Sequence, residues 1–234
     1  MLCWILWSFF GALPFVFSGQ IPHLIDAFFE ISSGFTTTGA SILTNVEALS
    51  HTALFWRSFT HWIGGMGVLV FLLAIIPLSG GSNINLMRAE SPGPSVGKLV
   101  PKMKYTARIL YIIYFGMTIL EFIFLIIGKM PVFDSICTAV GTGGFGVKND
   151  SLGSYSPYLQ WVVAIFMILF GVNFNAYYYI IYRHFKKAFK MEEVRCYFAI
   201  ILIATAIIFA NILDRCVSIF DALTKSVFQV ASLI

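Results

Sequence analysis

Charged side chains are scarce in this chain of 234 residues: Asp, Glu, Lys and Arg together make up 11% of it. Soluble domains carry roughly 25%. Hydrophobic residues account for 59%, and 24 of them are Phe. The sequence also lacks the alternating segments of about ten residues that mark outer-membrane barrels. These features exclude an ordinary soluble domain and predict an all-α membrane protein.

Catalytic and metal-binding patterns are missing as well. The four cysteines (Cys3, Cys137, Cys196 and Cys216) are scattered, and the four histidines share no metal-ligand spacing. The sequence shows no nucleophile turn. The net charge of +4 comes from basic residues beside apolar segments, so it does not indicate nucleic-acid binding. We therefore expect neither an enzyme nor a resident cofactor.

Long apolar runs predict membrane spans, because about 20 such residues cross a bilayer. Four runs are long enough: Ala53–Ile76, Tyr105–Ile127, Tyr158–Tyr182 and Cys196–Leu213. A fifth run, Leu2–Phe17, is shorter and follows Met1 directly, without a polar flank. We expect this run to be a span whose beginning is truncated.

Basic residues are concentrated in two of the segments between these spans. The opposite segments, residues 18–52 and 128–157, carry only Lys129 and Lys148. Short loops rich in Lys and Arg stay on the cytoplasmic side of a membrane. We therefore expect a multi-pass plasma-membrane protein of bacterial type with the basic loops 79–104 and 183–195 in the cytoplasm.

A short motif recurs three times, as Ile25-Asp26-Ala27, Phe133-Asp134-Ser135 and Phe220-Asp221-Ala222. Each copy follows a predicted span. Each Asp suits the N-cap or the first turn of a short helix, whose C-terminal end then carries partial negative charge that favours a cation. The predicted unit is a span, a short re-entrant pore helix, a Thr/Gly strip and a second span. It occurs twice in full and begins a third time.

This repeat divides the chain into five parts. We expect a first pore unit over 1–78, a cytoplasmic connector over 79–103, a second unit over 104–183, a cytoplasmic loop over 184–195 and the start of a third unit over 196–234. The stretch Gly34–Ser41, which contains the first strip, reads GFTTTGAS. Small residues let the backbone approach an ion, and threonine hydroxyls add oxygens. Irregular backbone at membrane depth is tolerated where it lines a watery path or is buried in protein, so the strip predicts part of a cation pore.

Three stretches carry a resemblance to a known family: GALPF at 11–15, SSGFTTTGAS at 32–41 and FWRSFTHWIGGMGV at 55–68. They closely resemble the Trk/Ktr potassium-uptake family, specifically its TrkH-type transmembrane subunit. TGGFG at 142–146 looks like that family's second filter strip. The likeness extends over essentially the whole chain.

The resemblance implies a potassium transporter, with potassium as substrate, in which four units surround a path and filter carbonyls replace the water shell of the ion. The filter residues it implies are Thr36, Thr37, Thr38 and Gly39 in the first unit and Thr142, Gly143 and Gly144 in the second. Members of the family are often homodimers and are regulated by a cytosolic nucleotide-binding ring protein.

Two features depart from the family pattern. Asp26 precedes Gly39 by thirteen positions, whereas Asp134 precedes Gly144 by only ten, so the second pore helix should be shorter by about 4.5 Å. The third strip is expected where the chain ends, at Ile234, which predicts a fragment with two complete units out of four. The alternative is a non-conducting fragment that only associates with other membrane subunits.

A few polar residues and glycines inside the spans leave alternatives open. Arg57 and His61 share a helix face, and for Arg57 we favour a structural role, either snorkelling to the interface or binding the carbonyls of a re-entrant helix, over ion gating. Glu121 lies deep in a span, where we favour a buried hydrogen bond over an ion-linked role. Gly64, Gly65 and Gly67 superficially resemble a dinucleotide loop, but their place inside a span favours close helix packing.

Overall fold

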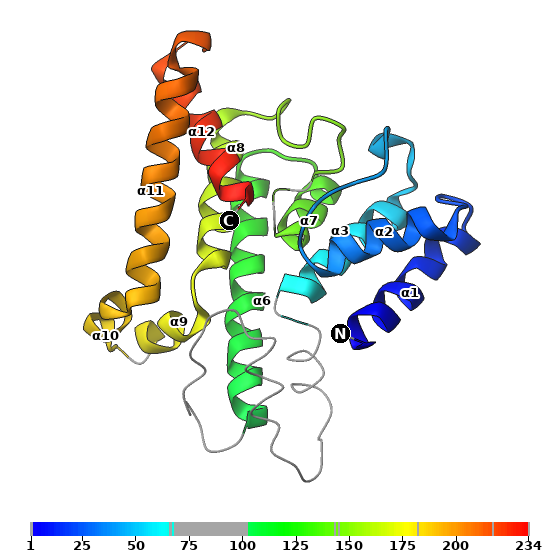
Figure 1. The fold of residues 1–234 in the computed structure, drawn as a ribbon, viewed down its shortest axis with the longest axis horizontal. Coiled ribbons are helices and arrows are strands. Elements are labelled where there is room, and N and C mark those ends of the chain that lie inside the picture. Colours follow the sequence, from blue (N-terminus) through cyan, green and yellow to red (C-terminus); the bar gives the residue numbers. More distant parts are fainter. Residues whose placement is uncertain are drawn as a thin grey trace.

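The computed structural model describes residues 2–65, 67, 103–142, 144, 146–181, 183–216 and 218–233. Every regular element within these residues is a helix (Figure 1). In chain order they are α1 (Leu2–Phe17), α2 (Leu24–Phe35), η1 (Val46–Ala48), α3 (His51–Gly65), α6 (Met103–Ile127), α7 (Val132–Gly141), α8 (Pro157–Gly171), α9 (Phe174–Ile181), α10 (Phe185–Lys190), α11 (Glu192–Ile212), η2 (Leu213–Arg215) and α12 (Ile219–Leu233). The predicted connector 79–103 lies outside the described residues, except for Met103.

Three helices, α2, α7 and α12, follow α1, α6 and α11 respectively, and they contain 12, 10 and 15 residues. The third residue of each is an aspartate: Asp26, Asp134 and Asp221. The N-cap residues of α2 and α7 are His23 and Pro131, and neither makes a side-chain cap bond. The aspartates therefore lie in the first turn, where the positive end of the helix dipole favours a carboxylate.

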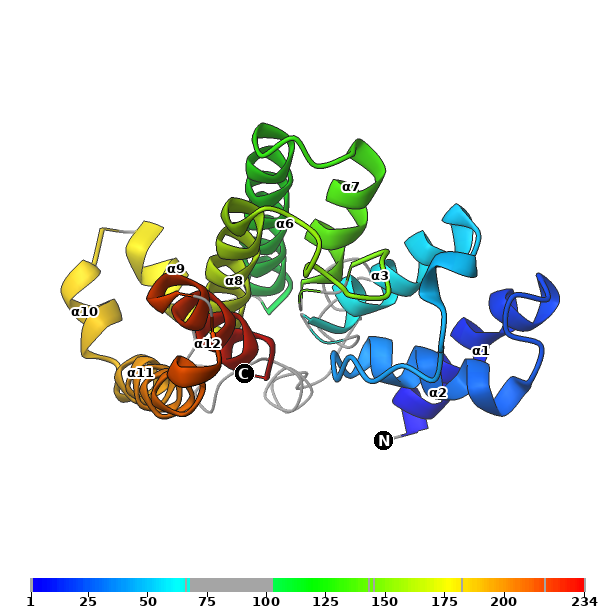
Figure 2. The same ribbon diagram turned by 90° about the horizontal axis from the view of Figure 1, so that it is seen from above.

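The C-terminal ends of α2, α7 and α12 converge on one region when the molecule is seen from above (Figure 2). We call these three the inward helices. Helix α2 packs between α1 and α3, α7 packs on α3 and α6, and α12 packs on α8 and α11. Because the C-terminal end of a helix carries partial negative charge, their common region favours a cation.

Glycines bring α2 and α3 into close contact. A Cβ atom on Gly64 would lie 2.1 Å from the carbonyl oxygen of Phe35, and one on Gly34 would lie 2.2 Å from Thr60 Oγ1. Neither position has room for a larger residue, which confirms the packing role predicted for Gly64. The contact fixes the last turn of α2 against α3.

Two of the described helices, α6 and α11, are long and apolar enough to cross a membrane, over Arg108–Ile127 and Glu192–Arg215. Helices α1, α7 and α8 are apolar but shorter. Helix α3 is described as far as Gly65, and most of the remainder of the predicted span Ala53–Ile76 lies outside the described residues. Of the predicted spans, those at α6 and α11 are therefore supported by helices of membrane-crossing length, whereas the described helices α1, α3 and α8 are shorter.

The segment predicted as one span over 158–182 forms two helices, α8 and α9, with a break after Gly171. A break leaves backbone carbonyls without helical partners. Here the hydroxyl of Tyr177 donates to the carbonyl of Leu169 at 2.5 Å, and Tyr197 donates to the carbonyl one residue earlier at 2.8 Å. The Leu169 carbonyl also accepts the backbone N–H of Val172 at 3.2 Å. The tyrosine hydroxyls thus supplement the backbone bonds at the end of α8 and stabilise the break within an apolar sequence.

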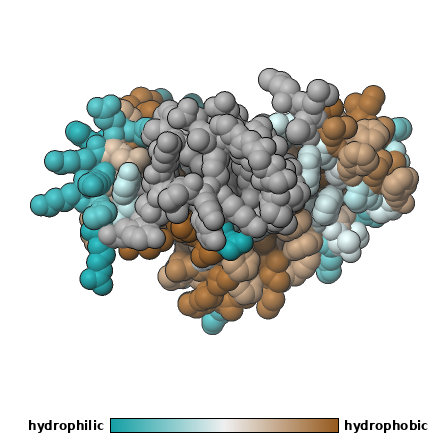
Figure 3. Space-filling view, turned by 90° about the horizontal axis from the view of Figure 1, so that it is seen from below, coloured by the Kyte–Doolittle hydropathy of each residue, from teal (hydrophilic) through white to brown (hydrophobic). Residues whose placement is uncertain are grey.

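Seen from below, hydrophilic side chains gather at the left edge of the molecule, the side on which α10 lies in Figure 1 (Figure 3). Helix α10 lies in the basic segment 183–195, whose basic residues are Arg183, Lys186, Lys187, Lys190 and Arg195. Helix α11 instead exposes apolar side chains, and only 6% of its apolar window is buried. Apolar helices with a basic end are typical of a membrane protein.

Candidate functional site

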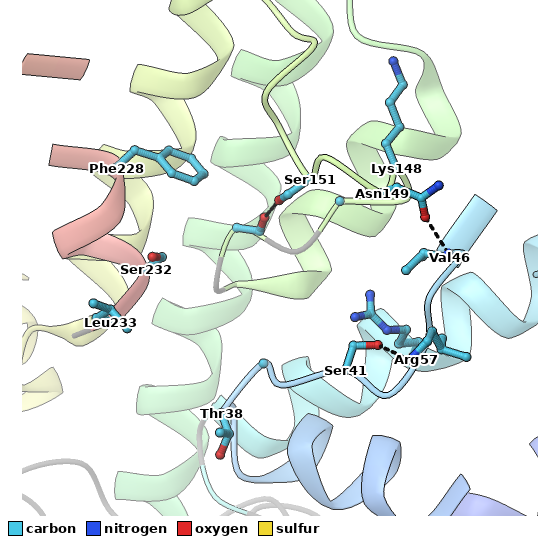
Figure 4. Close-up of a pocket in the computed structure, with 14 residues that line it drawn as sticks. Thr38, Ser41, Val46, Arg57, Lys148, Asn149, Ser151, Phe228, Ser232 and Leu233 are labelled. Carbon is cyan, nitrogen blue, oxygen red and sulfur yellow. Dashed lines mark hydrogen bonds between the residues drawn. The ribbon is translucent and has the colours of Figure 1, made fainter. Parts of the chain in front are cut away.

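A cavity of about 420 Å³ lies where the inward helices converge (Figure 4). One side is formed by the end of α12, which contributes Phe228, Ser232 and Leu233. The other walls come from the segments that follow α2 and α7 and from Arg57 of α3. The cavity therefore collects residues from all three repeats of the sequence motif.

The first strip, residues 36–39, continues α2 through a Schellman motif. The backbone N–H of Thr38 bonds the carbonyl of Ser33, and that of Thr37 bonds the carbonyl of Gly34, both at 3.0 Å. Thr37 has a φ of 53°, the left-handed conformation that ends such a helix and that is more often adopted by glycine. These bonds occupy two N–H groups of the strip. Its backbone is thus anchored to α2 on its N–H side.

The second strip, residues 142–144, follows α7 directly. Thr142 is the C-cap of α7 and has a φ of 48°, and Gly144 has a φ of 77°. The hydroxyl of Ser151 donates to the carbonyl of Gly144 at 2.5 Å. Gly143 lies outside the described residues.

The two strips share a backbone pattern. Positive φ values occur at Thr37 and Gly39 in the first strip and at Thr142 and Gly144 in the second, two positions apart in each. This pattern aligns Gly39 with Gly144, as the sequence comparison of the strips predicts. Positive φ values depart from an extended strand, in which φ is negative and successive groups point to opposite faces.

Some of the predicted filter residues line the cavity, whereas others are not part of its wall. Thr38, Gly39 and Gly144 are part of its wall. Thr36 and Thr37 join this wall to the end of α2, and the Thr36 hydroxyl lies 2.7 Å from that of Thr38. Both strips reach one cavity although the second is three residues closer to its aspartate.

A cluster of hydrogen bonds joins the loops beyond the two strips. The Asn149 side chain accepts from the backbone N–H of Val46 at 2.6 Å and donates to Asn45 Oδ1 at 3.0 Å. Its backbone N–H donates to Glu47 Oε1 at 3.1 Å. We call these residues the inter-loop clasp. Sequence reasoning missed it, because its partners lie about a hundred positions apart and no motif marks them.

The bond favoured for Arg57 joins it to a residue that the sequence analysis did not single out. Arg57 Nε donates to Glu30 Oε1 at 2.6 Å, and both side chains are buried. Glu30 lies on α2, so Arg57 binds an inward helix through a carboxylate rather than through a carbonyl. The signal that sequence reasoning overlooked is an acid four residues after Asp26 on an otherwise apolar helix.

Glu121 and His61 behave differently from Arg57. Glu121 is 1% exposed, and no hydrogen-bond partner for its Oε2 atom occurs among the residues described here. The buried bond favoured for it is thus not seen at that oxygen. His61 Nδ1 lies 2.9 Å from the carbonyl of Arg57, within its own helix. Neither residue is part of the cavity wall.

The first turn of α7 is tied to the loop that follows the second strip. Tyr155 donates to Asp134 Oδ2 at 2.6 Å. Burial of the phenol raises the pKa of Tyr155, and the hydrogen bond to Asp134 raises it further. A raised pKa favours the protonated donor in the folded state. This contact therefore contributes fully below about pH 10, the ordinary tyrosine value, and is lost only as the pH rises through the raised pKa.

Known proteins resemble this chain along nearly all of its length. The family described as TrkH, cation transport protein, matches residues 2–231. The Trk system potassium uptake protein TrkH of Salmonella typhimurium is 36% identical over 246 residues, which cover 100% of this chain and 50% of that protein. TrkG of Escherichia coli is 36% identical over 209 residues, or 86% of this chain and 43% of that protein.

A solved structure agrees with these relatives. The crystal structure of the potassium transporter TrkH from Vibrio parahaemolyticus matches with a TM-score of 0.80 and 28% identity, over 99% of this chain and 48% of that one. The chain thus spans about half the length of the relatives it matches. Since the family match covers almost every residue, the chain belongs to the TrkH family of cation transport proteins.

Proposed function

We propose that this chain supplies part of the permeation path of a potassium transporter, and that its two strips coordinate dehydrated potassium through backbone carbonyls. The observation that carries the proposal is the cavity to which both strips contribute, at the point where three helix C-termini converge. Carbonyl rings of this kind replace the hydration shell of an ion. The potassium-uptake relatives supply the choice of ion.

The backbone of the strips supports carbonyl coordination. In the first strip, the N–H groups of Thr37 and Thr38 are used by bonds to α2. Positive φ values two positions apart allow neighbouring carbonyls to face one side. Glycine at position 39 adopts its φ of 74° without the steric cost that a Cβ atom brings.

The remaining features of the transporter are part of the same proposal. Potassium is the transported substrate, and the strips act without a cofactor and without catalysis. The basic loops 79–104 and 183–195 face the cytoplasm, as the positive-inside rule indicates. By family resemblance, the complete protein is a homodimer that works with a cytosolic nucleotide-binding ring protein.

The test compares two glycines that share a backbone conformation. Gly39 lines the cavity, whereas Gly19, with a φ of 70°, lies in the turn between α1 and α2 with nothing within 4 Å of an added Cβ atom. Gly39→Ala should lower the ratio of rubidium to sodium uptake by about tenfold, which corresponds to roughly 1.4 kcal/mol. Gly19→Ala introduces similar backbone strain and should leave this ratio unchanged.

Uptake is measured with radioactive rubidium in proteoliposomes that contain a complete transporter with this sequence. Equal rubidium-to-sodium ratios for Gly39→Ala and the unaltered protein would remove the filter assignment.

The second candidate function is a membrane subunit that conducts nothing and only associates with others. Reconstitution of this chain alone separates the two functions. Selective rubidium uptake by the chain alone would reject the non-conducting function.

A further inference from the structure

The first strip is followed by a segment that is held by a buried ion pair. Glu30 of α2 is 2% exposed and Arg57 of α3 is 5% exposed, and Arg57 Nε lies 2.6 Å from Glu30 Oε1. A buried charge is tolerated when it is paired and hydrogen-bonded, and it becomes costly when its partner is removed. The two charges therefore have to be considered together.

The Glu30 carboxylate reaches the chain just beyond the strip. Ser41 Oγ lies 3.0 Å from each oxygen of Glu30, and the backbone N–H of Ile42 donates to Oε2 at 3.1 Å. Ser41 follows Gly39 by two positions. A carboxylate has about four acceptor positions, and three donor groups surround that of Glu30: Arg57 Nε, the Ser41 hydroxyl and the Ile42 N–H. The outer end of the first strip thus depends on where this carboxylate lies.

The cavity wall contains two cationic side chains, Arg57 and Lys148. Lys148 extends away from the cavity in Figure 4, donates to Ser154 Oγ at 3.1 Å and lies 4.3 Å above the ring of Tyr155. Arg57 stands on the side of Ser41, across the cavity from α12. An arginine stays charged at every accessible pH, so it repels a nearby cation unless a counter-charge offsets it. Glu30 supplies such a counter-charge.

We propose that Glu30 and Arg57 form a neutral positioning pair for the first strip. Glu30 sets the outer end of the strip through Ser41 and Ile42, and it offsets the charge that Arg57 brings to the cation path. Both are positioning residues, because they act on the ion through the strip and through the local field. This inference rests on the proposed potassium path and adds a determinant of its affinity and selectivity.

The electrostatic role makes a prediction about sign. Glu30→Gln removes a counter-charge of Arg57 and adds net positive charge beside the path, so the KM for rubidium should rise by about tenfold. Arg57→Met leaves the carboxylate uncompensated beside the path, so the KM should fall. The double variant Glu30→Gln/Arg57→Met removes both charges and should return the KM to within about threefold of the unaltered protein. A purely structural role would lower the amount of active protein and would not shift the KM in opposite directions.

The positioning role is tested without disturbing the buried charges. Ser41 is exposed, so Ser41→Ala should still fold; it removes the hydrogen bonds to Glu30 and the acceptor of the Leu43 N–H. We expect the rubidium-to-sodium uptake ratio to fall by about threefold to tenfold with little change in KM. Ser18→Ala is the matched control, because its hydroxyl donates to the carbonyl of Phe15 at the end of α1, and Ser18 is not part of the cavity wall.

All variants are assayed as complete transporters in proteoliposomes, with Gly39→Ala measured beside them. If Gly39→Ala loses selectivity but Ser41→Ala does not, the positioning role is rejected and the proposed function stands. If Glu30→Gln and the double variant have the same KM, the electrostatic role is rejected. If Gly39→Ala itself is unchanged, the proposed function fails. If either single charge variant fails to insert in the membrane, Ser41→Ala and the double variant still test the proposal. Selectivity and KM equal to those of the unaltered protein in Ser41→Ala would overturn it. A tenfold shift of KM in the double variant would also overturn it.

Discussion

At the scale of single residues, the strips combine a common conformation with different supports. Gly39 and Gly144 share a positive φ, and each lies two positions after a threonine that also has a positive φ, Thr37 and Thr142 respectively. The chain after Gly39 is held by a carboxylate, whereas the carbonyl of Gly144 accepts a hydroxyl from Ser151. The two repeats therefore reach similar backbone geometry through unlike side chains.

The hydroxyl of Ser151 offers a direct test of the second strip. Ser151→Ala removes the donor at 2.5 Å from the Gly144 carbonyl, which should loosen the strip by about 1 kcal/mol and lower the rubidium-to-sodium uptake ratio. Ser154→Ala, in the same loop, removes a hydroxyl that bonds Lys148 and Asp150 rather than the strip. Equal uptake ratios for the two variants would contradict a role of the Ser151 bond in selectivity.

The sequence predicted residues of the first strip that line the cavity, but it did not predict the side chains that hold the strip in place. Thr38 and Gly39 were predicted from the composition of the strip and its family resemblance. Glu30 was not, because its partner Arg57 lies 27 positions away and only the fold brings the two together. Pairing between distant residues has no local signal, so composition could indicate the strip but not what holds it.

At the scale of helices, the contact between α2 and α3 determines where the first strip begins. Gly64 faces the backbone of Phe35, the last residue of α2. Hydrophobic runs predicted α6 and α11 well, because an apolar stretch of that length has few other uses. They did not predict the break after Gly171, since the residues on both sides of it are apolar and the hydroxyls that stabilise it are contributed by α9 and α11.

Replacement of Gly64 should separate these two helices. In Gly64→Ala the new methyl group would lie 2.1 Å from the Phe35 carbonyl oxygen, so the backbone must shift, with a loss of stability of about 1–3 kcal/mol. Gly116→Ala on α6 is the control, because nothing lies within 4 Å of its added Cβ atom. The midpoint of thermal unfolding in detergent should fall by several degrees for Gly64→Ala alone. Equal midpoints would show that the close contact does not limit stability.

At the scale of the whole molecule, the repeats meet at the cavity and again at the inter-loop clasp. The clasp joins loops about a hundred positions apart through Asn45, Val46, Glu47 and Asn149. The sequence motif indicated the repeats and their order, but not the bonds between them. Such bonds depend on the relative placement of the repeats, which a periodic pattern does not contain.

A double-mutant cycle on the clasp measures how strongly the repeats are coupled. Asn45→Ala and Asn149→Ala each remove the 3.0 Å bond between the two amides. Each should destabilise by about 1–2 kcal/mol, because Asn149→Ala also removes the acceptor of the Val46 N–H and Asn45→Ala also removes that of the Glu47 N–H. The double variant should be less destabilised than the sum of the two single variants, with a coupling of at least about 0.5 kcal/mol in thermal or denaturant unfolding. Additive effects would mean that the loops are held independently.

The unequal lengths of the inward helices have a consequence for engineering. From its aspartate to its aligned glycine, the first repeat has three residues more than the second. Two of them are helical, since α2 has 12 residues and α7 has 10, a difference in rise of about 3 Å rather than the expected 4.5 Å, and the third lies between the helix end and the glycine. A chimera that copies the first repeat into the place of the second would therefore carry its glycine too far along the helix axis. Grafts between these repeats need a compensating deletion of about one helical turn, so the first and second repeats are not interchangeable.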